Sequence, residues 1–155
     1  MTQRNAVSWP SRLSRAQDRR RLLAEEMTHL EKIVAGPASA EDWLDRVEIG
    51  LSDLRQALDA HITEVEGPDG LLAEIVELAP RLSAQTDELR EDHMEILGAW
   101  LRTEATVRAA RGNGEDLRAL IRRRVVNLIG RLTLHRQAGS DLVFEAYNVD
   151  IAASD

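Results

Sequence analysis

The chain has 155 residues, a formal net charge of −7 and no cysteine. This length suits a single domain covering residues 1–155, with a core large enough to fold without disulfides. The absence of thiols excludes disulfides, thiolate metal sites and cysteine nucleophiles. The negative charge argues against nonspecific nucleic-acid binding, and the arginines concentrated at residues 12–21 and 122–124 are expected to lie on solvated helix faces.

The sequence also argues against membrane and secretory functions. No apolar run approaches the roughly 20 residues that span a bilayer, and residues 1–10 lack the apolar stretch of a secretory signal. We therefore expect a cytoplasmic protein without membrane contact. The aromatic content of 3% is too low to predict a stacking surface for single-stranded nucleic acid.

Proline, glycine and capping residues delimit the first two predicted helices. The first helix is expected over about residues 10–35, because Pro10 suits a first turn and a Gly-Pro pair follows the helix. The second is expected over about residues 40–66, because Ser39 and Asp42 have the spacing of a capping box. A Gly-Pro-Asp-Gly run must interrupt this second helix, since proline removes a hydrogen-bond donor and glycine favours a turn.

The second half of the chain divides in the same way. A short helix is expected at residues 71–78, and a third long helix over about 80–110 ends at a Gly-Asn-Gly run. The last helix is expected over about 115–147, with an acidic pair in its first turn, and a tail follows from Asn148. No segment alternates like a strand. The chain is therefore predicted to be all-α, an antiparallel up-down four-helix bundle.

Each long helix has an apolar seam at alternating steps of three and four residues, the pattern of an inward face in a bundle of near-parallel helices. The first helix has the weakest seam. The seam positions are Leu23, Met27, Leu30 and Val34; then Leu44, Val47, Leu51, Leu54, Leu58, His61 and Val65; then Leu82, Thr86, Leu89, His93, Ile96, Trp100, Thr103 and Val107; and finally Leu117, Ile121, Val125, Leu128, Leu132, His135, Gly139 and Leu142.

Three of these seams contain one histidine each: His61, His93 and His135, while His29 lies beside its own seam. A lone inward histidine is usually an ordinary core residue. Three unpaired ones would each cost roughly 1–3 kcal/mol, a large share of the 5–15 kcal/mol that stabilises a typical domain. His93 lies 20 residues before the Asn113 turn and His135 lies 22 residues after it, so the two are expected at one level of the bundle.

The pattern resembles the hemerythrin-like, or HHE cation-binding, family over most of the chain. His61-Ile-Thr-Glu-Val-Glu is similar to the family's second-helix histidine with acids after it, and Glu91-Asp92-His93 resembles its third-helix Glu-His. His135 with the later Leu142-Val143-Phe144 resembles the last helix, and the separations of 32 and 42 residues also suit the family. The resemblance implies a four-helix bundle that holds one or two iron ions in its core and acts in sensing, storage or binding of oxygen or nitric oxide.

The sequence departs from the family at several ligand positions. The family usually has a carboxylate four residues after the second- and fourth-helix histidines, where this chain has Val65 and Gly139. The first-helix histidine is also missing. Glu64 lies near the face of the preceding histidine and is the preferred substitute ligand, whereas Glu66 and Asp141 are less well directed.

The first hypothesis is therefore a single metal ion bound by core histidines, with one carboxylate completing the set. Three imidazoles with water or a carboxylate suit ferrous iron or zinc. The predicted metal ligands are His61, His93, His135 and Glu64. A small diatomic ligand is the expected partner, and Gly139 would leave space for it.

The second hypothesis is a metal-free relative that acts as an interaction or regulatory module. The histidines would then pair with one another or with water, and the partner would be another protein or a second copy of the chain. Trp9, Trp43 or the arginine-rich first helix would provide the contact surface. Catalysis is disfavoured under both hypotheses, because Ser140 near His135 has no recognisable nucleophile turn.

Overall fold

The computed structural model describes residues 9–112 and 116–149, and the side chains of 12–112 and 116–148. The described residues form helices and turns but no strand, which confirms the all-helical prediction with its four long helices. None of these helices is both long and apolar enough to span a membrane. The elements are α1 (Trp9–Ala35), α2 (Trp43–Glu66), α3 (Leu71–Leu78), the 3-10 helix η1 (Pro80–Leu82), α4 (Ser83–Gly112), α5 (Arg118–Phe144) and the π-helical turn η2 (Glu145–Val149).

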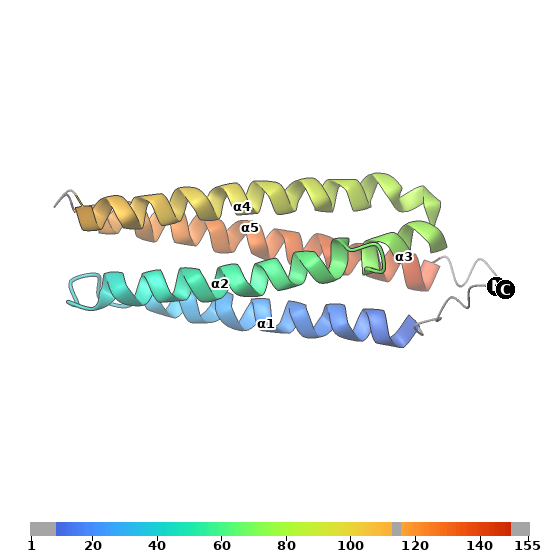
Figure 1. Cartoon of the computed structure of the whole chain (residues 1–155), viewed down its shortest axis with the longest axis horizontal. Coiled ribbons are helices and arrows are strands. Elements are labelled where there is room, and N and C mark those ends of the chain that lie inside the picture. The colour runs from blue at the N-terminus through green and yellow to red at the C-terminus, as the bar shows by residue number, and fades with distance from the viewer. Residues whose placement is uncertain (1–8, 113–115, 150–155) are drawn as a thin grey trace.

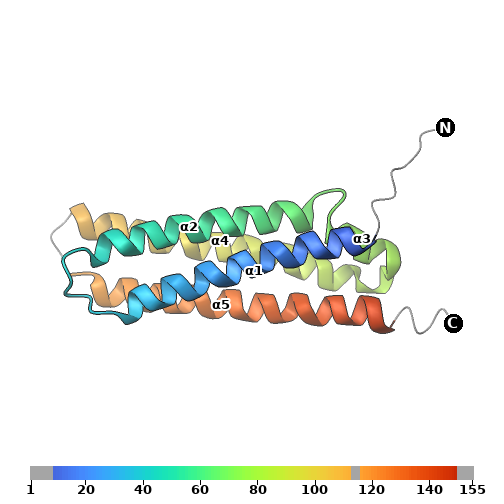
Figure 2. The same ribbon diagram turned by 90° about the horizontal axis from the view of Figure 1, so that it is seen from below.

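The four long helices lie side by side along one axis in both views (Figures 1 and 2). The most extensive contacts join α1 to α2 and α4 to α5. The short helix α3 lies at the end of the molecule where α1 begins and where α2 and α5 end (Figure 1). Side chains of α3 therefore cover one end of the space between the long helices.

The start of α2 differs from the prediction. Asp42 is the N-cap residue, but its side chain makes no capping hydrogen bond, so the predicted capping box with Ser39 is wrong. Backbone bonds form turns before the helix instead, with Ala40 N donating to Pro37 O at 3.2 Å and Trp43 N to Ala40 O at 3.1 Å. Local backbone pairing thus takes the place of the side-chain cap.

Trp43 is part of the core rather than of an exposed contact surface. It is 0% exposed, and its indole Nε1 donates to the backbone oxygen of Ile33 at 3.2 Å. The expectation of an exposed Trp43 is therefore wrong, because the indole buries a large apolar area while its one polar atom finds a partner. The side chain of Trp9 lies outside the described residues.

The predicted seams form the core. Nearly all seam positions are buried; the partly exposed ones are Leu44, Leu117 and Gly139. The buried apolar residues fall into two clusters. The larger cluster ends with Leu58 on α2 and Leu132 on α5, and the smaller one, beside α3, begins with Val65 and Leu142.

The predicted histidines lie between these two apolar clusters. On α2, His61 falls between Leu58 and Val65, and on α4, His93 falls between Leu89 and Ile96. On α5, His135 falls between Leu132 of the larger cluster and Leu142 of the smaller one. Along the length of the helices, the core therefore consists of the larger apolar cluster, then one polar layer that contains the histidines, and then the smaller apolar cluster.

Candidate metal centre

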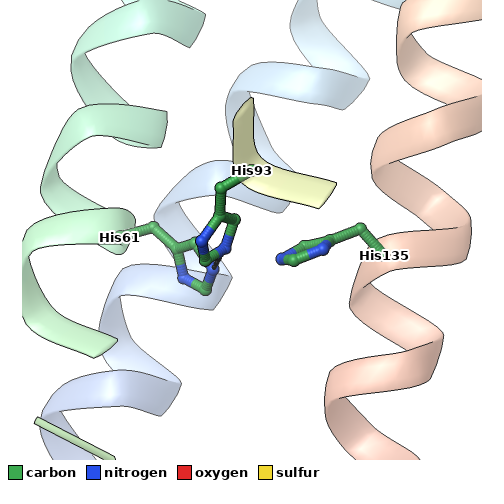
Figure 3. Close-up of side chains that lie close together, drawn as sticks. All are labelled: His61, His93 and His135. Atoms are coloured by element: carbon green, nitrogen blue, oxygen red, sulfur yellow. Dashed lines mark hydrogen bonds between the residues drawn. The ribbon is translucent and has the colours of Figure 1, made fainter. Parts of the chain in front are cut away.

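The side chains of His61, His93 and His135 converge from three helices, α2, α4 and α5 (Figure 3). We call these residues the histidine cluster. The ring centroids of His93 and His135 are 4.4 Å apart, which confirms the prediction that these two residues share one level. The ring centroid of His61 lies 5.3 Å from that of His93 and 5.8 Å from that of His135.

The spacing of the ring nitrogens is close to what a metal ion requires. One nitrogen from each histidine lies within 4.8 Å of the others, and the Nε2 atoms of His61 and His93 are 3.3 Å apart. Ligands at 2.0–2.1 Å from a tetrahedral metal are separated by about 3.3 Å. The pair His61 and His93 already has this separation, and a ring nitrogen of His135 lies within 4.8 Å of one from each of the other two histidines.

Carboxylates lie beside the Nδ1 atoms of two of the imidazoles. Asp92 Oδ2 lies 2.7 Å from His135 Nδ1, and Glu66 Oε1 lies 3.2 Å from His93 Nδ1 in a contact that is too poorly aligned for a good hydrogen bond. A carboxylate at Nδ1 favours the tautomer with the proton on that nitrogen, and the Nε2 lone pair is then free to bind a metal.

Burial keeps His61 and His93 neutral. Loss of hydration, followed by the nearby charges of the other two histidines and of two arginines, lowers the pKa of His61 from 6.5 to about 3. Burial also lowers the pKa of His93, and His135 acts in the same direction, whereas Glu66 opposes the shift. Neutral imidazole is the form that binds metal, so His61 and His93 need no deprotonation near neutral pH.

The predicted carboxylate ligand Glu64 does not join the cluster. Its Oε1 accepts a hydrogen bond from Arg15 Nε of α1 at 2.7 Å. A position three residues after His61 is rotated by about 60° from its face, and in this bundle that rotation directs Glu64 toward α1. Asp141, the other remote candidate, accepts from Gln137 Nε2 at 2.9 Å.

A residue that the sequence did not reveal occupies the α1 side of the same layer. Arg20 lies between the two apolar clusters, since Ala16 belongs to one and Leu23 to the other. Its Nη2 donates to the Arg136 backbone oxygen at 3.1 Å and to Ser140 Oγ. The first-helix histidine that the family resemblance implies is missing from this chain, and Arg20 of α1 contributes a cation to this layer.

A cavity of about 40 Å³ adjoins the histidine cluster. Its lining is mostly aliphatic, and Gly139 contributes to it; a Cβ added at Gly139 would meet no atom within 4 Å. A single water needs roughly 10–15 Å³ of such space. The cavity can therefore hold a ligand of about three non-hydrogen atoms beside the imidazoles.

An acidic groove of about 480 Å³ runs along α4 and α5 on the other side of Asp92. Such a groove concentrates cations at the surface. Asp92 thus contacts both the groove and His135. The carboxylates that line it are Glu88, Glu91, Asp92, Glu95, Asp141 and Glu145.

Comparison with protein-family models, curated proteins and solved structures found no match to this chain. The hemerythrin-like resemblance stays a prediction from helix order and histidine spacing.

Proposed function

We propose that this chain binds one divalent metal ion through the histidine cluster, His61, His93 and His135, within a hemerythrin-like, antiparallel up-down bundle. The supporting observation is the convergence of three buried imidazoles, which are 5%, 2% and 4% exposed. Three inward histidines without a compensating ligand would be costly in an apolar core. A bound ion would repay that cost through three metal–nitrogen bonds.

The set of donors favours a single borderline ion. Two hard cations need bridging carboxylates, but Val65 and Gly139 stand at the positions where the family has them. Imidazole nitrogen suits zinc and ferrous iron. With three protein ligands, a fourth position would face the cavity, so water or a small molecule could bind there.

Iron in this position would support binding of oxygen or nitric oxide, and hence sensing or storage, as the resemblance implies. The cavity volume of about 40 Å³ limits such a ligand to about three non-hydrogen atoms. No catalytic group is assigned, because the described side chains around the cavity include no activated nucleophile.

Metal analysis of untagged protein tests this proposal. Chelator-treated protein is loaded with Zn(II) or, without oxygen, with Fe(II), and the desalted sample is measured by elemental mass spectrometry. We expect about one ion per chain, falling below about 0.2 in His93→Ala. His29→Ala is the matched control, because His29 is exposed and groups with Glu26 and Asp53 at the surface. Metal retained by His93→Ala and lost by His29→Ala would refute the core site.

A second candidate is a metal-free interaction module. It is favoured by the His61 Nε2–His93 Nε2 contact of 3.3 Å, which lets one imidazole satisfy another without an ion, and by the Arg20 cation in the same layer. Melting temperature separates the candidates. At 100 times its Kd, a metal adds about 2.7 kcal/mol of stability, or roughly 5–11 °C in a domain of this size. An unchanged melting temperature supports the metal-free module.

A further inference from the structure

Two arginines line the cavity beside the histidine cluster. Arg20 reaches it from α1 and Arg136 from α5, and both side chains are partly buried. The remaining lining is aliphatic apart from the histidines and Gly139. Two cationic residues thus line one small cavity.

Neither guanidinium has a carboxylate partner among the described residues. The hydrogen bonds of Arg20 go to a backbone oxygen and to the Ser140 hydroxyl, both neutral acceptors. Arg136 Nε is buried and has no hydrogen-bond partner in the described part of the chain. Burial lowers the pKa of Arg20, and the neighbouring Arg136 charge acts in the same direction.

The carboxylates that could neutralise this pair are engaged elsewhere. Glu64 pairs with Arg15 and Asp141 with Gln137. The two carboxylates nearest the cluster contact imidazole nitrogens instead. Charges withdrawn from water are normally paired, and these two partly buried arginines have no carboxylate partner among the described residues.

We infer that the cavity binds a small monovalent anion, a carboxylate or oxyanion of about three non-hydrogen atoms, between Arg20 and Arg136. The limit on size follows from the cavity volume of about 40 Å³. Guanidinium groups bind planar oxyanions through paired hydrogen bonds, and an anion here would accept from the unpartnered Arg136 Nε. This inference does not depend on a bound metal, because the two arginines are present in the metal-free chain.

Formate is the test ligand, and formamide is its neutral counterpart of the same size. Calorimetric titration of chelator-treated wild-type protein, at constant sodium concentration, should show saturable binding of formate and none of formamide. Arg136→Gln should weaken formate binding at least tenfold, and Arg136→Lys should retain part of it. The matched control is Arg131→Gln, which alters an exposed arginine of α5 that pairs with Glu95 at the surface; it should leave the formate Kd unchanged.

A second variant tests the cavity without touching either charge. Gly139→Leu fills the open space next to the histidine cluster and should abolish formate binding while the helical circular dichroism persists. The inference is overturned if wild-type protein does not bind formate, if formamide binds equally well, or if Arg136→Gln and Arg131→Gln bind formate alike. Because the protein is metal-free throughout, these outcomes are independent of the metal proposal.

Discussion

Acid should destabilise the metal-free protein through His61, and replacing this residue by leucine should remove that part of the effect. The His61 pKa is about 3 in the folded chain against an ordinary 6.5. Between these values the unfolded chain binds a proton that the folded chain excludes, so the free energy of unfolding falls as pH falls. From pH 7 to pH 5 the loss from His61 alone is about 2 kcal/mol.

Urea unfolding of chelator-treated protein at pH 7, 6 and 5 measures this loss. Between pH 7 and pH 5, the free energy of unfolding should fall by about 2 kcal/mol more in wild type than in His61→Leu. His93, whose pKa is also lowered by burial, adds to the drop in both proteins. The absolute stability of His61→Leu is not the readout, because leucine also removes a buried polar group.

His29→Leu provides the matched control, because His29 is an exposed histidine on α1. It should show the same pH dependence as wild type. Equal pH dependence in wild type and His61→Leu would refute the reasoning, since it would mean that His61 titrates alike in the folded and unfolded chains.

Three further predictions concern orientation and packing. Asp92→Asn removes the carboxylate 2.7 Å from His135 Nδ1 and should weaken zinc binding about 10- to 100-fold by competition with a chelating dye. Gly139→Ala should stabilise the metal-free protein by about 0.5–1 kcal/mol in urea, because alanine favours helix and meets no atom there. Gly50→Val should cost about 1–3 kcal/mol, because a Cβ at Gly50 already lies 3.0 Å from Leu30 Cδ1.

Each of these has its own control. Asp87→Asn changes an exposed aspartate that pairs with Arg90, so equal zinc affinity in the Asp87 and Asp92 variants would exclude an orienting role. Gly130→Ala tests helix propensity at another open position of α5, and both alanine variants should gain stability. A Gly50→Val protein as stable as wild type would contradict the close approach of α1 and α2.

Helix positions and seams could be predicted because they depend on local punctuation and on periodic burial. The bounds of α1 and α3 match the expectation to within one residue. The starts of α2 and α5 lie about three residues later than predicted. No side-chain cap forms at Asp42. The predicted acidic first turn of the last helix is wrong for Asp116, which precedes the first residue of α5, and Glu115 lies outside the described residues. Cap formation depends on competing turns, which a spacing rule does not reveal.

The histidines of the site were predictable, but their carboxylate partners were not. Each histidine lies on a seam, and burial follows from the seam. The direction of Glu64 depends on Arg15, which is 49 residues away, and the contact of Asp92 with His135 spans 43 residues. Arg20 was missed because an arginine does not fit the apolar pattern by which the seams were recognised. Only the packing of α1 shows that it shares the histidine layer.

The polar layer between two apolar clusters also fixes how far each helix slides along its neighbours. A shift of one turn, about 5.4 Å, would move His93 among leucines and separate Asp92 from His135. Each buried polar group that loses its partner in this way costs about 1–3 kcal/mol. A leucine that moves into the place of another leucine costs little. The layer therefore selects one alignment of α2, α4 and α5 from several that apolar seams alone would permit.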